Sequence, residues 1–186
     1  MTQITREIAQ KVLNTVDAGL TKGIGESIPG QMCVEAAVCF ALGLPHGDEP
    51  DCVAPSLRAL KIRLNDLDWS CNQARAKGLR ELALLQLGSK ENLDEVEFVK
   101  RVAMLVVNKY LPPILRKVNL EVEADACEQA ANLADTCTAA SAASAASSVA
   151  AAASAAADKV LAEFAQDVAA ILIDMKVPGV QWLNLI

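Results

Sequence analysis

The feature that most constrains the fold is an alanine-rich stretch that runs from about Glu121 to Lys176. Its centre, residues 139–157, is almost entirely Ala and Ser. Alanine has the highest helix propensity of the amino acids, and neither Pro nor Gly interrupts the stretch. As one helix it would be roughly 80 Å long, far longer than a globule of this chain length is wide. We therefore expect it either to project and pair with a second copy, or to fold back near Ser147.

The remainder of the chain also has helical periodicity, because apolar residues recur three or four positions apart in successive segments. The apolar residues are mainly Ala, Leu and Val, whereas strands favour aromatic and β-branched side chains. The sequence therefore predicts an all-α protein, a helical bundle with one very long Ala-rich C-terminal helix. We expect a helical domain over residues 1–120, and the long helix with an apolar tail packed on it or on a second copy over residues 121–186.

Periodicity and turn residues give approximate bounds for the individual helices. We expect helices over residues 3–18, 31–42, 56–66, 69–87 and 95–114. Asp68 should cap the fourth of these, and Asn92 with Glu95 should form a capping box for the fifth. Pro112 and Pro113 should kink or interrupt the fifth helix. The closing residues VQWLNLI are too apolar to remain in solvent, so we expect them to pack back on the domain.

Charge and composition exclude several classes of protein. The net charge of −6 argues against a nucleic-acid-binding protein. The run 139–157 is long enough to span a membrane, but it lacks Leu, Ile and Phe and contains five serines, so we expect no membrane insertion. The opening MTQITREIAQ lacks the basic-then-apolar pattern of a signal peptide, which predicts a cytoplasmic protein. The six cysteines form no CxxC pair, and we expect free thiols.

Glu35 is the most unusual residue of the sequence. It is the only residue charged at neutral pH in MCVEAAVCFAL, a segment that is apolar on all sides and is therefore expected to be buried. A buried carboxylate needs a partner or a raised pKa. The proline-rich loop LPHGDEPDCVAP follows at once and contains His46 and Cys52. The interpretation we favour is structural: Glu35 accepts hydrogen bonds from backbone amides of this loop.

Two chemical alternatives for the same region remain open at this stage. In the first, Cys33, Glu35, His46 and Cys52 bind zinc, although no two of them have the usual ligand spacing. In the second, Cys33 or Cys52 is a nucleophile and His46 is its base. Since neither pattern matches a known spacing, we expect no metal and no cofactor.

Basic residues are concentrated in the helical pair that begins at Ser56. We expect them on its outer faces, either in solvent beside nearby acids or as a local site for a small anion. The candidate ligand-binding residues are Arg58, Lys61, Arg75 and Arg80.

Three stretches resemble a loosely defined set of uncharacterised bacterial and bacteriophage proteins. They are PGQMCVEAAVCFALGLPHGDEPDCVAP, the Ala-rich helix and the closing ILIDMKVPGVQWLNL. The resemblance implies no catalytic residue, but it is consistent with a role in host interaction or signal sequestration.

Taken together, the residues favour a non-enzymatic helical binding protein. We expect it to be a homo-oligomer through the Ala/Ser face and to hold a small phosphate- or nucleotide-like anion. The alternative is a small thiol- or metal-dependent hydrolase that uses Glu35, His46 and Cys33 or Cys52.

Overall fold

The computed structural model describes residues 3–131 and 154–186, with side chains of the second range from Asp158 onward. These residues are mainly helical, and no β-strand occurs among them apart from one isolated bridge between Gly25 and Met32. The predicted all-α class is confirmed. By packing, the chain divides into one unit of Met1–Glu95 with Ser154–Ile186 and another of Val96–Ala153, whereas the sequence suggested a division near residue 120.

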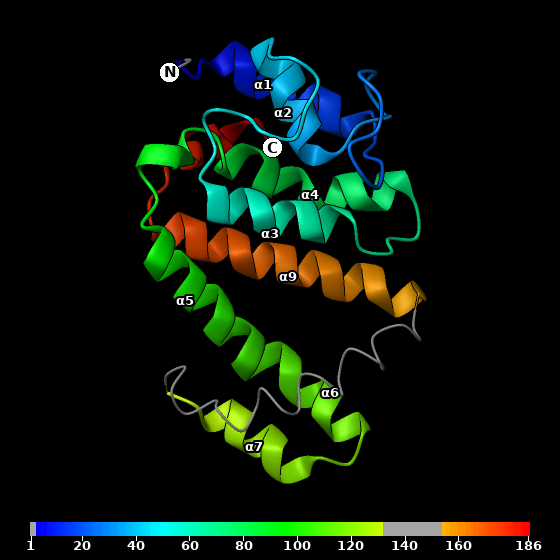
Figure 1. Ribbon diagram of the computed structural model, residues 1–186, viewed down its shortest axis with the longest axis vertical. Coiled ribbons are helices and arrows are strands. Elements are labelled where there is room, and N and C mark those ends of the chain that lie inside the picture. The colour runs from blue at the N-terminus through cyan, green and yellow to red at the C-terminus, as the bar shows by residue number, and fades with distance from the viewer. Residues whose placement is uncertain (1–2, 132–153) are drawn as a thin grey trace. The chain divides into compact units, whose positions relative to one another are not determined.

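Helix α4 (Asn72–Leu85) is the centre of the first unit. It packs against α1 (Arg6–Asp17), α2 (Val34–Leu42), α3 (Pro55–Asn65) and α9 (Ser154–Asp174), as Figure 1 shows. The apolar side chains of α4 supply much of the core, and the fully buried ones are Leu79, Leu82, Ala83, Leu84 and Leu85. An amphipathic helix that is covered on several sides in this way derives most of its stability from packing.

Local sequence signals account for the end of α2 but not for the start of α4. Glycine in the left-handed conformation ends α2 at Gly43, where φ is 72°. The predicted cap of α4 by Asp68 is wrong, because the Sγ atom of Cys71 accepts the hydrogen bond from the Ala74 amide at 3.4 Å. Asp68 instead pairs with Lys22 at 2.9 Å.

The C-terminal tail packs on the first unit, as the sequence predicted. It forms the 3-10 segment η5 (Pro178–Leu185), which contacts α4 and α1. Gly179 lies directly against the end of α4, since a Cβ atom at this position would be 2.4 Å from the carbonyl oxygens of Leu84 and Leu85. Only glycine allows this approach.

The second unit consists of consecutive helical segments. They are α5 (Glu95–Leu105, whose first residue belongs to the first unit), the π-helical turn η2 (Val106–Tyr110), α6 (Leu111–Lys117) and α7 (Glu121–Gln129). A small core joins α6 to α7 and contains Leu111, Leu115, Ala124 and Cys127. The α-helix is interrupted in the turn before the two prolines, at the π-helical η2. Pro112 and Pro113 have no N–H group, so the carbonyls four residues before them, in η2, receive no α-helical hydrogen bond.

The predicted capping box at the start of α5 is wrong. The Asn92 amide donates to the Gly88 carbonyl at 2.9 Å, within the turn that contains the 3-10 segment η1 (Ser89–Glu91). The Glu95 carboxylate accepts from the Ser56 amide at 2.7 Å, so it caps α3.

A single helix from Glu121 to Lys176 is also wrong. Helix α7 ends at Gln129, and Ala130 has the extended ψ value of 121°. The Asn108 side chain donates to the carbonyls of Glu128 and Ala130, which satisfies groups that a continuing helix would have used. Helix α9 then has 21 residues. The expected break near Ser147 lies outside the described residues.

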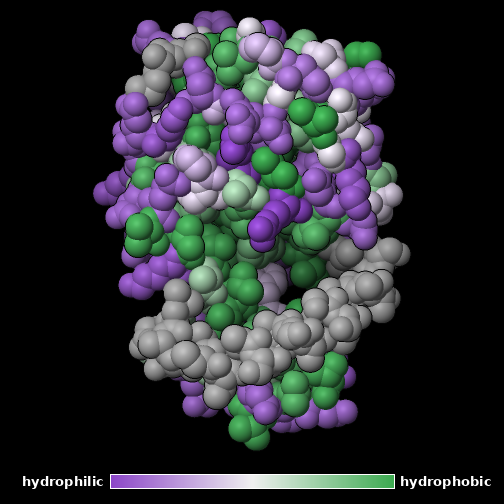
Figure 2. Space-filling model, viewed as in Figure 1, coloured by the Kyte–Doolittle hydropathy of each residue, from purple (hydrophilic) through white to green (hydrophobic). Residues whose placement is uncertain are grey.

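On the face seen in Figure 2, hydrophobic residues are scattered among hydrophilic ones over α1 to α4. Among the described residues, we find no helix with the combination of length and hydrophobicity that a membrane span requires.

Candidate functional site

Glu35 lies in the core, as predicted, but its partner is not the proline loop. Its Oε1 atom is 2.6 Å from the Nζ atom of Lys61 on α3, and both side chains are 0% exposed. Lys61 also donates to the Oε1 atom of Gln86, which immediately follows α4. Apart from Lys61, neither Glu35 oxygen has a hydrogen-bond donor among the described residues. The structural interpretation based on the loop amides is therefore wrong.

Burial changes the pKa values of both members of this pair. Desolvation raises the pKa of Glu35, against the opposing attraction of Lys61. Desolvation likewise lowers the pKa of Lys61, against the attraction of Glu35. Replacing such a pair with apolar residues is often neutral or stabilising, whereas removing one partner is strongly destabilising. The pair therefore constrains which side chains can occupy this part of the core.

The residues of the predicted hydrolase do not form a catalytic arrangement. Cys33 caps α2, and burial raises the pKa values of Cys33 and Cys52. Burial also raises the pKa of Cys39 to about 11. These thiols are protonated near neutral pH, whereas the thiolate is the nucleophile. The His46 ring donates from Nε2 to the Gly25 carbonyl at 3.0 Å, so it ties the proline loop to the preceding glycine-rich loop.

The zinc alternative is not supported either. Across residues 3–131 and 154–186, no three His, Cys, Asp or Glu side chains are grouped so that they could hold a metal ion. Cys33, Glu35, His46 and Cys52 therefore do not form a ligand set.

The four basic residues predicted to bind an anion do not share a surface. Lys61 and Arg75 are buried, which corrects their expected position on the outer faces of the helical pair. The Arg75 guanidinium donates to the carbonyls of Asn65 and Leu20 at 2.7 and 3.0 Å. Arg58 pairs with Glu49 at 2.9 Å, and Arg80 with Asp17 at 2.7 Å.

The sequence contained a signal for the two buried cations. Lys61 is four residues after Leu57 and three before Leu64, so it lies on the apolar stripe of α3. Arg75 is four residues before Leu79 and seven before Leu82, so it lies on the apolar stripe of α4.

A cleft of about 360 Å³ lies between α4 and α9, and we call it the α4–α9 cleft. Its apolar lining consists of Trp69, Ala74, Gly78, Ala162 and Ala165. Small residues on both helices leave this space open. A Cβ atom on Gly78 would be 2.3 Å from the Trp69 ring, so glycine is needed for the ring to lie against α4.

Charged side chains also line the α4–α9 cleft. Lys77 and Lys159 are exposed, and within the described residues neither ammonium group has an ion-pair or hydrogen-bond partner. Both Asp158 oxygens accept hydrogen bonds from Ser70, and these bonds lower the pKa of Asp158. Glu81 is the other carboxylate in the lining. Lys77 belongs to the basic residues that the sequence placed on the outer faces of the helical pair, but its pairing with Lys159 was not predicted. The two lysines are 82 positions apart and meet only through the packing of α9 on α4.

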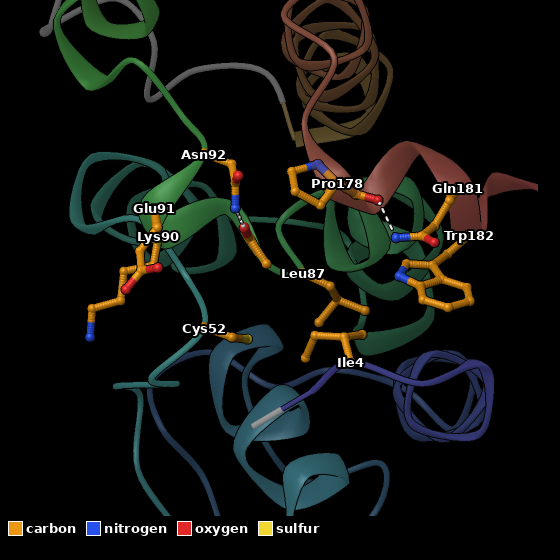
Figure 3. A pocket seen from close by; sticks show the side chains of 10 residues that line it. Ile4, Cys52, Leu87, Lys90, Glu91, Asn92, Pro178, Gln181 and Trp182 are labelled. Atoms are coloured by element: carbon orange, nitrogen blue, oxygen red, sulfur yellow. Dashed lines mark hydrogen bonds between the residues drawn. The ribbon is translucent and has the colours of Figure 1, made fainter. Parts of the chain in front are cut away.

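A second cleft, of about 260 Å³, lies where η5 meets η1 and the segment before α1, and we call it the Trp182 cleft. Its lining includes Ile4, Cys52, Leu87, Pro178 and Trp182, which are drawn in Figure 3.

Comparison with protein-family models, curated proteins and solved structures gave no match.

Proposed function

We propose that this chain is a non-enzymatic helical binding protein that holds a small organic anion in the α4–α9 cleft. The observation that carries the proposal is the pair of lysines, Lys77 and Lys159, whose ammonium groups have no protein partner within the described residues. A phosphate or carboxylate placed between them would gain charge-assisted hydrogen bonds.

The two ammonium groups of the cleft are available to an anion. The Asp158 carboxylate is already held by Ser70, just before α4. Lys77 and Lys159 formally balance Asp158 and Glu81, but among the described residues neither ammonium group is paired with a carboxylate. An anion can therefore gain contacts with both ammonium groups, and salt should weaken the attraction because the groups are exposed.

The apolar lining favours a ligand with an apolar or aromatic body. The Trp69 indole and the methyl groups of Ala74, Ala162 and Ala165 present carbon atoms to the cleft. Ligand sites commonly combine apolar walls with a few polar groups that fix orientation. A nucleotide-like compound, with a planar base and a phosphate, has both properties.

The alternative of a thiol-dependent hydrolase is less well supported. The three buried thiols near Glu35 have raised pKa values, and His46 is engaged with a backbone carbonyl. A nucleophile needs a base within hydrogen-bond reach, and no hydrogen bond between a cysteine and His46 occurs in the described part of the chain.

The test uses AMP, adenosine and inorganic phosphate as matched probes. In a Trp182→Phe background Trp69 is the only tryptophan, so its fluorescence reports on the α4–α9 cleft. We expect AMP to bind more tightly than adenosine or phosphate, because it alone combines both halves of the ligand. Lys77→Gln and Lys159→Gln should each weaken AMP binding by about two- to fivefold, the range for exposed ion pairs.

Lys90→Gln is the matched control, because Lys90 is an exposed lysine that lines the other cleft. It should leave AMP affinity unchanged. Equal affinities for AMP and adenosine, or equal effects of all three lysine substitutions, would contradict the anion site.

We also propose that the chain self-associates through the Ala/Ser face of residues 139–157. The support is the sequence alone, since side chains this small need close contact with another helix to be held in order. Static light scattering on wild-type protein and on Ala143→Leu with Ala146→Leu tests this proposal. A monomer mass at micromolar concentration, unaffected by the substitutions, would exclude the oligomer.

A further inference from the structure

We infer that the Trp182 cleft is a second binding site, selective for a small neutral compound that joins a carbonyl group to an apolar body. The inference is independent of the anion site, because the two clefts share no residue.

The indole N–H of Trp182 is the central observation. Its Nε1 atom is shielded from solvent and has no hydrogen-bond acceptor in the described structure. The other tryptophan is different, since Nε1 of Trp69 donates to the Leu64 carbonyl at 2.9 Å. A buried donor without an acceptor is unfavourable, so an entering acceptor would remove an existing penalty.

The side-chain amide donors around the cleft are already engaged with backbone carbonyls. The Asn92 amide donates to the Gly88 carbonyl, and the Gln181 amide donates to the Pro178 carbonyl, each at 2.9 Å. Figure 3 draws both bonds and shows the nitrogen edge of Trp182 directed toward Leu87. On the side of the cleft formed by η5, the indole therefore remains as the donor that a ligand can use, which favours a compound with a single acceptor.

The ligand should be neutral. The charged side chains of the lining are Lys90 and Glu91, which are adjacent and opposite in sign. In Figure 3 both lie on the far side of the cleft from the indole. A carboxylate that accepted from Trp182 would consequently have no cation beside it, whereas a ketone or amide carbonyl needs none.

The walls supply the apolar contacts. Ile4, Leu87, Pro178 and the Trp182 ring all line the space. Gln181 is exposed and next to Trp182, so its side chain can move aside to open the path to the indole nitrogen. The volume of about 260 Å³ suits a compound of one ring or a short chain.

Two-dimensional ¹H–¹⁵N NMR of the full chain tests the inference directly. The chain has two indole N–H signals, which Trp69→Phe and Trp182→Phe assign. Before any addition, the Trp182 proton should resonate upfield of the hydrogen-bonded Trp69 proton. Benzamide should then move the Trp182 proton downfield in a saturable manner. Toluene, which has the same ring without an acceptor, should bind more weakly and cause no downfield shift.

Trp182→Phe keeps an aromatic ring but removes the donor, so it should weaken benzamide binding about tenfold, to the level of toluene. Ile4→Gln, placed before α1 begins, should weaken both compounds because it removes an apolar contact from the wall. An unmoved Trp182 signal at high benzamide concentration, or benzamide and toluene bound equally, would overturn the inference. The wild-type titration decides this even if a variant fails to fold.

Discussion

Replacing Lys61 with Met should destabilise the protein by about 3–5 kcal/mol, the usual penalty for removing one partner of a buried ion pair. Both side chains of the pair are 0% exposed, with 2.6 Å between Nζ and Oε1, and in the described part of the chain Glu35 has no other donor. The substitution therefore leaves a buried carboxyl group without compensation. A loss of this size is a large fraction of the roughly 5–15 kcal/mol that stabilises a typical protein.

The double variant Glu35→Leu with Lys61→Met should recover most of this loss. Well-packed apolar side chains can replace a buried ion pair with little change, or even a gain, in stability. Urea unfolding followed by circular dichroism measures both free energies. Lys22→Met is the matched control, because the Lys22–Asp68 pair is 59% and 92% exposed and should contribute little to stability.

The stability of the Lys61→Met variant should also depend on pH. Burial raises the pKa of Glu35 in the folded state above the unfolded value of 4.5. As pH rises above about 4.5, the unfolded state loses its proton first, so the free energy of unfolding falls until the folded pKa is reached. The variant should therefore regain stability on acidification toward pH 4.5. A single variant within 1 kcal/mol of wild type, or a double variant no more stable than the single, would refute the reasoning.

Two further predictions concern the cysteines and the glycines. Cys71 is exposed, and hydrogen bonds from the amides of Ala74 and Gln73 lower its pKa. Iodoacetamide should therefore modify Cys71 before the buried Cys33, Cys39 and Cys52. Mass spectrometry of the folded protein checks this order, and equal rates would contradict it. Gly78→Ala should destabilise the protein by about 1–3 kcal/mol and change Trp69 fluorescence, because the new Cβ would be 2.3 Å from the indole. Unchanged fluorescence and melting temperature would count against the packing of Trp69 on α4.

Helix positions in the first unit could be predicted because their signals are local. The four-residue spacing of Ile8, Val12 and Val16 gave α1 within a few residues, and Gly43 marked the end of α2. The burial of Glu35 followed in the same way from the apolar segment around it. Local patterns determine which face of a helix is covered, and these predictions needed nothing more.

Partners could not be predicted where they depend on packing between distant segments. Lys61 is 26 positions after Glu35, so the pair could not be recognised from the sequence. The charge of Lys61 suggested an exposed side chain, although its position in the helix is on the same face as Leu57 and Leu64. The end of α7 had no sequence signal, because Ala130 is a strong helix former and the amide that satisfies the terminal carbonyls comes from Asn108. The lysines of the α4–α9 cleft meet only when α9 packs on α4.

The most direct test of the central claim is NMR of the wild-type chain with AMP, following the Trp indole and Ala methyl signals. We expect saturable shifts of the Trp69 indole and of the methyl groups of Ala74, Ala162 and Ala165, with the Trp182 indole unchanged. No shift at millimolar AMP, or shifts centred on Trp182 instead, would contradict an anion site between α4 and α9.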